Sequence, residues 1–297
     1  GTYFLYPVFK HRRLSKRLSM KILEKNTIAQ CLGTKITRLV IHAPLIAAKI
    51  KPGQFVVVMA KEQGERIPLT VVDKDPVSGS ITLIIQEIGF STRLLSAMSQ
   101  EDSVYAVAGP MGHATPIKRY GNVVLVGGGL GIAELYPIGR AMKEAGNHIT
   151  VILGAKTKGL LLLEEKIRLV SDILHITTDD GSYGRKGFVT GILSEVLNLA
   201  DAGPKPVLVY AVGPIPMMKS VSEVTKVFGV ETIVSLNALM VDATGMCGGC
   251  RVKIGSQVKF SCVDGPEFNA HLVDWDELIN RSRAYIDKEE HICRLGR

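Results

Sequence analysis

The chain has 297 residues, of which 46% are hydrophobic and 22% are charged. This length allows roughly two or three domains, and no apolar run approaches the ~18 residues that a membrane-spanning helix needs. Residues 1–19 contain five basic residues and no acidic one, so they supply most of the formal net charge of +8. The remainder is close to neutral, which argues against nucleic-acid binding through a basic surface.

Residues 1–19 are expected to be a leader or an upstream extension in front of Met20, where a strand-like pattern begins. From there to residue 117, turn signals such as Pro52-Gly53 and Gly109-Pro110 separate short apolar runs. The runs that predict strands are residues 36–42, 54–59, 67–72 and 81–87. Because no long helix separates them, a small antiparallel barrel is expected.

Two segments of this barrel contain groups suited to a flavin. Arg66 offers a guanidinium for a phosphate, close to the Thr70 hydroxyl, which suits a ring nitrogen. Gly89 begins an expected helix whose first amides and hydroxyls suit a pyrophosphate. From the residues alone the alternative stays open, because an arginine beside a strand is commonly a solvated strand end.

The pattern changes after residue 120. A short buried strand at 123–126, a glycine turn at 127–131, a helix at 132–144 and a strand at 149–153 follow one another. This is the order of a nucleotide-binding βαβ unit. A later strand at 207–212 leads into Gly213-Pro214 and repeats the theme, so residues 118–232 are expected to form a Rossmann-like α/β domain.

The glycine turn itself suits a dinucleotide. Glycines let a pyrophosphate approach the backbone, and the amides at the start of the next helix face the anion. The turn departs from GxGxxG after Gly131, and no acidic residue ends the second strand at 154–157. We therefore expect a ribose contact unlike that of an ordinary dinucleotide fold. Tight strand–helix packing is the alternative explanation for these glycines.

Three cysteines near the end of the chain have the most specific spacing. If Asp242 replaces a first cysteine, the pattern is ligand-x4-Cys247-x2-Cys250-x11-Cys262. This is the spacing of a plant-type 2Fe–2S loop with one carboxylate ligand. Glycines at 245, 248 and 249 leave room for backbone amides near cluster sulfurs. A structural zinc site, unlinked buried thiols, and an Asp242 that only caps a turn remain alternatives.

The other cysteines, Cys31 and Cys293, lie outside this spacing and are expected to be ordinary thiols. Five cysteines with three clustered do not resemble a disulfide framework, so we expect a reducing compartment and a cytoplasmic location. Residues 274–297 are expected to form a charged helix that packs on its own domain or docks on a partner. Its apolar stripe consists of Leu278, Ile279, Tyr285 and Ile286.

Taken together, residues 20–268 resemble the ferredoxin–NADP reductase superfamily, and within it the electron-transfer subunits that append a 2Fe–2S loop. Each motif is modest alone, but their order is highly specific. The motifs are Pro52-Gly53-Gln54-Phe55, Arg66-x-Pro68-Leu69-Thr70, the turn at 127–131, Thr178-Asp179-Asp180-Gly181, Gly213-Pro214 and Cys262-Val263-Asp264-Gly265-Pro266. Asp242 with three cysteines is similar to the small subunit of NADH-dependent reduced ferredoxin:NADP oxidoreductase. The electron-transfer subunit of dihydroorotate dehydrogenase has a cysteine at that place.

The resemblance implies an FAD-binding barrel at 20–117, an NAD(P)-binding domain at 118–232, a 2Fe–2S region at 233–270 and a helical tail at 271–297. The implied flavin-binding residues are Arg66, Pro68, Leu69, Thr70, Gly89, Ser91 and Thr92. The implied nicotinamide-nucleotide residues are Gly127, Gly129, Gly131, Asp180 and Gly213. The implied cluster ligands are Asp242, Cys247, Cys250 and Cys262.

The implied activity is that of an NAD(P)H-dependent oxidoreductase subunit, with NADH expected as its nucleotide. Hydride exchange takes place with FAD, and single electrons pass through the cluster to or from a larger subunit with its own FAD and 4Fe–4S clusters. The setting is flavin-based electron bifurcation between NADH, NADPH and ferredoxin, with no catalytic side chain. A dihydroorotate dehydrogenase subunit and a non-enzymatic nucleotide- or zinc-binding module remain alternatives.

Overall fold

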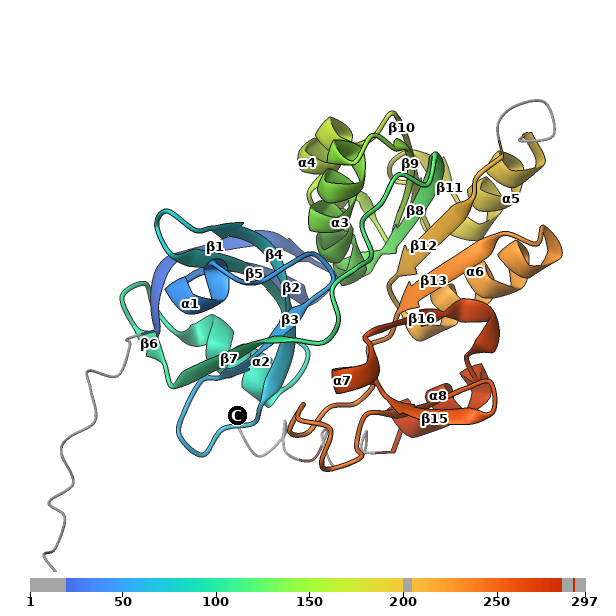
Figure 1. The fold of residues 1–297 in the computed structure, drawn as a ribbon. Helices are drawn as coiled ribbons and strands as arrows, with labels where there is room; N and C mark the ends of the chain where they lie inside the picture. Colours follow the sequence, from blue (N-terminus) through green and yellow to red (C-terminus); the bar gives the residue numbers. More distant parts are fainter. Residues whose placement is uncertain (1–19, 200–204, 285–290, 292–297) are drawn as a thin grey trace, which may run out of the picture.

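The computed structural model describes residues 20–199, 205–284 and 291. Figure 1 shows an N-terminal barrel on one side, an α/β layer beside it, and a small C-terminal region below that layer. None of the helices in these ranges is long and apolar enough to cross a membrane. The predicted leader at 1–19, the tail positions Tyr285 and Ile286, and Cys293 lie outside the described residues.

The first sheet is a nearly closed antiparallel barrel with strand order β6-β1-β2-β5-β4-β3-β7. Alternate residues of its strands face inward, and opposite pairs such as Leu39 and Leu83 are fully buried. The prediction of an antiparallel barrel is therefore confirmed. Its elements are β1 (Met20–Cys31), β2 (Thr34–His42), α1 (Pro44–Ala47), β3 (Phe55–Met59), β4 (Ile67–Asp75), β5 (Ser80–Gln86), α2 (Phe90–Ala97), β6 (Ser103–Val104) and β7 (Ala106–Met111).

The second sheet has the order β11-β10-β9-β8-β12-β13-β16, and all its pairs are parallel except that between β13 and β16. Helices cover both faces, as in other doubly wound sheets. Its elements are β8 (Asn122–Gly128), η1 (Gly129–Gly131), α3 (Ile132–Glu144), β9 (His148–Ala155), η2 (Lys158–Leu160), α4 (Glu164–Val170), β10 (Ile173–Thr178), β11 (Arg185–Lys186), α5 (Val189–Leu199), β12 (Leu208–Val212), α6 (Ile215–Val227), β13 (Glu231–Ser235) and β16 (Glu267–Asn269). The predicted Rossmann-like domain is confirmed, and α3 has the predicted bounds.

This strand order has a switch point that matters for binding. From β8 the chain moves outward through β9 to β10, and it then returns to the other side of β8 to form β12. The loops after β8 and β12 therefore diverge at the carboxyl end of the sheet. Open α/β sheets bind their ligands in the crevice that forms there.

The C-terminal region begins and ends on the second sheet. The chain leaves β13, forms a small hairpin and a short helix, and returns as β16 along the edge of β13. The predicted division between residues 232 and 233 therefore lies inside β13. Cys250 and Cys262 share one apolar core with residues of the second sheet such as Val234. The elements are β14 (Arg251–Ile254), β15 (Gln257–Phe260), α7 (Ser261–Asp264), η4 (Ala270–Leu272) and α8 (Trp275–Ser282).

The described part of the C-terminal tail packs on its own domain. Leu278 is buried, and Trp275 Nε1 donates a hydrogen bond to the carbonyl of Ala270 at 3.2 Å. Arg281 donates to the carbonyl of Gly249, in the cysteine loop, at 2.9 Å. Helix α8 therefore supports the loop that contains the candidate cluster ligands.

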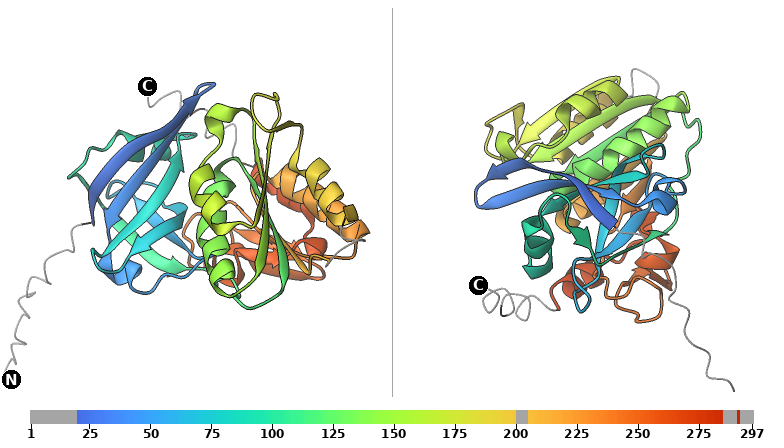
Figure 2. Two further views of the ribbon diagram at one scale, coloured as in Figure 1. Left: turned by 90° about the horizontal axis from the view of Figure 1, so that it is seen from above. Right: turned by 90° about the vertical axis from the view of Figure 1, so that its left-hand side faces the viewer.

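The barrel and the α/β layer are held together by an ionic contact. Asp73 on β4 pairs with Arg140 of α3 at 3.2 Å and with Lys166 of α4 at 3.3 Å. Both cations also lie over the ring of Tyr136. Figure 2 shows the barrel from two further sides, with α3 and α4 next to it. Val72 and Ile84 of the barrel also share an apolar core with residues of α3 such as Ile132, so the ionic contact is one of several that join the two walls of the intervening cleft.

Candidate functional site

A cleft of about 940 Å³ lies between the barrel and the carboxyl end of the second sheet. Its volume is at the upper end of the range for ligand pockets, about 300–1,000 Å³. One wall comes from β2, β4 and β5, and the other from the loops that follow β8, β9 and β12. Six of the predicted cofactor-binding residues line it: Pro68, Leu69, Thr70, Gly129, Gly131 and Gly213.

The glycines after β8 divide into two kinds. Gly129 has φ +55° and open space where a Cβ would stand, so it offers bare backbone to the cleft. A Cβ on Gly131 would lie 2.5 Å from the carbonyl oxygen of Val212, so that glycine lets two loops approach each other. Gly127 does not line the cleft, and its Cβ would meet Leu135 of α3. Gly128, which was not predicted, lines the cleft in its place.

The barrel wall presents Thr70 and Pro68, which are neighbours on β4, to the cleft. Arg66 is exposed just before β4 and is not among the cleft-lining residues.

Gly89, Ser91 and Thr92 form the start of α2, as predicted. The hydroxyls of Ser91 and Thr92 already have protein partners. Thr92 Oγ1 accepts from the amide of Gly89 at 3.0 Å, and Ser91 donates to the carboxylate of Glu65. These residues do not line the cleft, although Ile88 just before them does.

The ends of β9 and β10 contribute one positively and one negatively charged side chain to the cleft. Lys156 and Asp179 both line the cleft. The predicted Asp180 instead lies in the following turn, where its carboxylate accepts from the amide and the hydroxyl of Ser182 at 2.9 and 2.7 Å. Those hydrogen bonds hold the pKa of Asp180 below its ordinary value.

A buried acidic network, which sequence reasoning did not find, borders the cleft. Glu134 lines the cleft from the first turn of α3 and is 9% exposed. Thr70 Oγ1 donates to its Oε2 at 3.2 Å, and the Tyr210 hydroxyl lies 3.4 Å from its Oε1. The same hydroxyl donates to Glu267 Oε1 at 2.8 Å, and Thr115 also donates to Glu267.

Burial dominates the titration of this network. It raises the pKa of Glu134 to about 7, against the opposing effect of hydrogen bonds from Ser235 and Thr70. Burial also raises the pKa of Glu267. The only sequence signal is Glu134 itself, directly after Gly-Ile-Ala at 131–133, where it is one position of the predicted helix at 132–144.

The cysteine loop places its four predicted donors in two pairs. Cys250 and Cys262 are buried with their Sγ atoms 3.2 Å apart, and neither forms a disulfide. Asp242 lies near the exposed Cys247, and a hydrogen bond from the Thr244 amide at 2.9 Å holds its pKa below the ordinary value. Among the described residues, no three His, Cys, Asp or Glu side chains are gathered closely enough to hold a metal ion.

The loop nevertheless fits an iron–sulfur cluster by its chemistry. Ala243, Gly245 and Gly248 have positive φ angles, so the backbone curls tightly around the donors. Burial and the neighbouring Cys250 raise the pKa of Cys262 to about 12. A thiol of this kind ionises only when a cation is bound beside it, as ligation requires. Asp242 accepts a hydrogen bond from the Thr244 amide and so caps a turn, which is the alternative to ligation.

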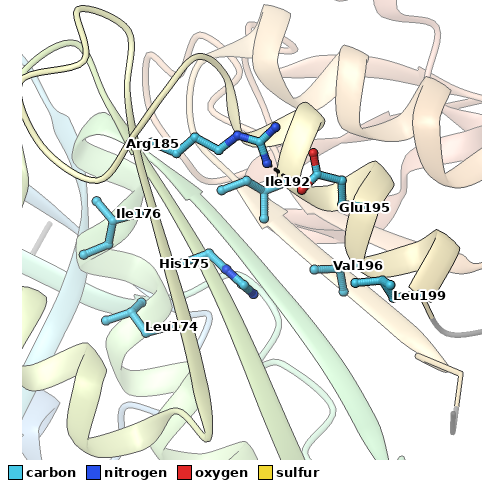
Figure 3. A pocket seen from close by; sticks show the side chains of 8 residues that line it. All are labelled: Leu174, His175, Ile176, Arg185, Ile192, Glu195, Val196 and Leu199. Atoms are coloured by element: carbon cyan, nitrogen blue, oxygen red, sulfur yellow. Dashed lines mark hydrogen bonds and ion pairs between the residues drawn. The ribbon is translucent and has the colours of Figure 1, made fainter.

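A second cavity, of about 300 Å³, lies at the far edge of the sheet between β10 and α5 (Figure 3). Arg185 and Glu195 form an ion pair at 2.5 Å across its mouth, and His175 lies beside apolar side chains. None of the predicted site residues lines this cavity.

Comparison with known proteins agrees with this geometry. A family model described as the iron–sulfur cluster binding domain of dihydroorotate dehydrogenase B matches residues 237–274. The prediction of a small iron–sulfur domain on the C-terminal side of the α/β domain is thereby confirmed. Ferredoxin–NADP+ reductase from Plasmodium falciparum matches over 71% of this chain and 91% of its own with a TM-score of 0.57, and at 15% identity that match shows the fold alone.

Two relatives match most of the chain. The Thermotoga maritima homologue of the dihydroorotate dehydrogenase B electron transfer subunit is 48% identical over 84% of this chain and 87% of its own length. The Shouchella clausii electron transfer subunit is 32% identical over 77% and 89%.

A solved structure of an NADH-dependent reduced ferredoxin–NADP oxidoreductase, described in terms of flavin-based electron bifurcation, matches with a TM-score of 0.85. The identity is 43%, and the match covers 95% of this chain and 98% of the other. The predicted resemblance is confirmed by these matches. The chain belongs to the family of iron–sulfur electron-transfer subunits built on the ferredoxin–NADP reductase fold, of which the dihydroorotate dehydrogenase B subunits are members.

Proposed function

We propose that this chain exchanges hydride between NAD(H) and a bound FAD, and passes single electrons through a 2Fe–2S cluster to or from a larger subunit. The observation that carries the proposal is the cleft, in which the barrel wall at Thr70 faces the glycine turn after β8. A flavin ring and a nicotinamide must lie face to face for hydride transfer, and this cleft has one wall suited to each.

A bound flavin would take two electrons as a hydride and deliver them one at a time. An iron–sulfur cluster can accept single electrons. The chain's own residues position these groups. Thr70 and Pro68 would hold the ring, while Arg66 and the amides at the start of α2, with Gly89, Ser91 and Thr92, would meet the flavin phosphates.

The opposite wall would hold the nicotinamide nucleotide. Gly129 and the first amides of η1 and α3 would meet its pyrophosphate, while Gly131 and Gly213 keep the two loops close. Asp179 at the end of β10 would repel a 2′-phosphate and favours NADH, whereas Lys156 at the end of β9 would attract that phosphate, so the preference for NADH rests on the resemblance as well. Gly127 and Asp180 act through the shape of the neighbouring turns.

The cluster would be held by Asp242 and Cys247 as one pair and by Cys250 and Cys262 as the other. A carboxylate is a harder ligand than a thiolate, so Asp242 is expected to alter the reduction potential of the cluster. The regions at 20–117, 118–232 and 233–270, the tail at 271–297 and a cytoplasmic location are part of the proposal, and β13 crosses the boundary between the second and third regions.

The similarity to the oxidoreductase chain, at 43% identity over 95% of this one, supports a role in flavin-based bifurcation between NADH, NADPH and ferredoxin. A dihydroorotate dehydrogenase partner is the second candidate, supported by the 48% identity to the Thermotoga maritima homologue. Purification of the native complex without air, followed by identification of the larger subunit, distinguishes them. A partner with 4Fe–4S clusters supports the first candidate, and a dihydroorotate-oxidising partner supports the second.

The nucleotide proposal has its own test. In steady-state reduction of an artificial electron acceptor, kcat/KM is expected to be higher with NADH than with NADPH. A preference for NADPH of roughly tenfold, equivalent to ~1.4 kcal/mol of differential transition-state binding, would contradict it.

A further inference from the structure

The buried acidic network beside the cleft has no role in the proposed function as stated so far. Glu134 is its member on the cleft wall, and it reaches Thr70 of the opposite wall through a hydrogen bond of 3.2 Å. The proposed function places the flavin ring against that threonine. A carboxyl group is thus one hydroxyl away from the expected position of the ring.

The hydrogen bonds indicate which carboxyl group holds a proton. The Tyr210 hydroxyl has one proton and lies between two carboxyl groups, 2.8 Å from Glu267 and 3.4 Å from Glu134. The shorter contact assigns that proton to Glu267, which also accepts from Thr115. Glu267 therefore has two donors and is suited to be the anion, whereas Glu134 is suited to hold a proton.

The charges around Glu134 agree with this assignment. The titratable groups that face it are Tyr210 on β12 and Glu267 on β16, and neutral hydroxyls come from Thr70 on β4 and Ser235 on β13. The cations of α3 and α4 are engaged elsewhere: Arg140 and Lys166 with Asp73, Lys143 with Asp172, and Arg168 with Glu164. The N-terminus of α3 favours the anion. Burial outweighs it and raises the pKa of Glu134 to about 7.

We propose that Glu134 is the proton-holding residue of the flavin site, and that it exchanges a proton with the bound ring through the hydroxyl of Thr70. This inference rests on the proposed function, which supplies the flavin. The direction of the Thr70 hydrogen bond follows the protonation state. When Glu134 is charged, Thr70 donates to it and offers a lone pair to an N–H of the ring. When Glu134 is protonated, it donates to Thr70, whose proton then points to the ring.

The exchange balances the electron transfer. Reoxidation of the reduced flavin anion removes two electrons and the N5 proton. The electrons leave singly through the cluster, which is reduced in turn. Thr70 gives its hydroxyl proton to the Glu134 carboxylate while its oxygen takes the N5 proton, so the ring loses one proton and Glu134 gains one. Glu134 therefore acts on the ring through Thr70.

The test uses the FAD-loaded protein with Glu134→Gln, which keeps the side-chain shape and cannot ionise. Glu144→Gln is the matched control, because Glu144 lies on the same helix and is exposed. The redox-induced infrared difference spectrum of the wild type should show a carboxylic C=O band that appears when the flavin is oxidised. The band should be absent in Glu134→Gln and retained in Glu144→Gln.

Two further measurements separate this role from a structural one. The pH dependence of the flavin midpoint potential should change slope near neutrality in the wild type and lose that change in Glu134→Gln. Flavin reoxidation by a one-electron acceptor should slow by roughly tenfold or more in Glu134→Gln. A variant that retains the band and the slope change would overturn the inference. Failure of NADH to reduce bound FAD in the wild type would instead contradict the proposed function, and this inference with it.

Discussion

Substitution of Gly131 by alanine tests the close approach of the two loops that form the nucleotide wall. The backbone of Gly131 has φ −59° and ψ −21°, which any residue adopts, so the added methyl group brings no backbone strain and its unfavourable effect is steric. That methyl group would lie 2.5 Å from the carbonyl oxygen of Val212 and 2.8 Å from the amide nitrogen of Gly213. Both atoms belong to the backbone, so the loops must separate by nearly an ångström to reach ordinary van der Waals contact.

The free-energy cost of Gly131→Ala comes from overpacking against backbone atoms, which cannot move away by a change of side-chain rotamer. Added methyl groups in well-packed regions cost about 1–3 kcal/mol. Because both displaced loops line the cleft, this cost is shared between the free energy of unfolding and nucleotide binding. If binding takes ~1.4 kcal/mol of it, the Kd for NADH rises about tenfold.

The assay measures both quantities on the same protein, by denaturant unfolding and by titration with NADH. The matched control is Gly191→Ala in α5, where a Cβ meets no neighbour within 4 Å and the glycine is exposed. There the substitution should stabilise the fold by about 0.4–1 kcal/mol. If Gly131→Ala changes neither the unfolding free energy nor the Kd by more than ~0.5 kcal/mol, the described approach of the loops is wrong.

The stability of the wild type should fall between about pH 4.5 and pH 7 by ~3 kcal/mol from Glu134 alone, because its raised pKa lets the folded state bind the proton more tightly over that window. Glu134→Gln should remove this part of the slope, as pH-dependent unfolding can measure, and an unchanged slope would contradict the assignment. Cys250→Ser should lose the 2Fe–2S centre but still bleach its flavin on mixing with NADH in stopped flow, whereas full turnover with the partner would mean that the cluster is structural. Asp242→Cys should keep a cluster with a shifted midpoint potential, and normal iron content with an unshifted potential in Asp242→Ala would show that Asp242 is no ligand. Asp73→Asn should lower stability by about 1 kcal/mol, because two half-exposed ion pairs are lost, and high salt should shrink the difference.

The elements predicted correctly depend on short stretches of sequence. Strands β2, β3, β4 and β5, helix α3 and the start of α2 follow from local periodicity and turn residues, whereas β1, β6 and β7 were not predicted individually. The cysteine spacing spans only 21 residues from Asp242 to Cys262. Local patterns of this kind reflect backbone preferences that act within a few residues. Helices α4, α5 and α6 were not predicted individually, because no sequence motif marks them.

Which residues face the cleft was decided by tertiary structure. The glycines of the turn are neighbours in the sequence, yet Gly127 packs under α3 while Gly129 faces the cleft. This difference in environment arises where the chain turns from β8 into η1. Similarly, Asp179 lines the cleft while its neighbour Asp180 caps a turn.

The sequence by itself determined the order of the regions, the glycine turn and the cysteine loop, because each is encoded within one short segment. Only the tertiary structure brought Glu134 to Thr70, Tyr210 and Glu267. In the sequence, Glu134 is 64 positions from Thr70 and 76 positions from Tyr210, and Tyr210 is 57 positions from Glu267. No local pattern encodes such contacts, because they form only when the barrel, α3, β12 and β16 pack together and exclude water from the groups between them.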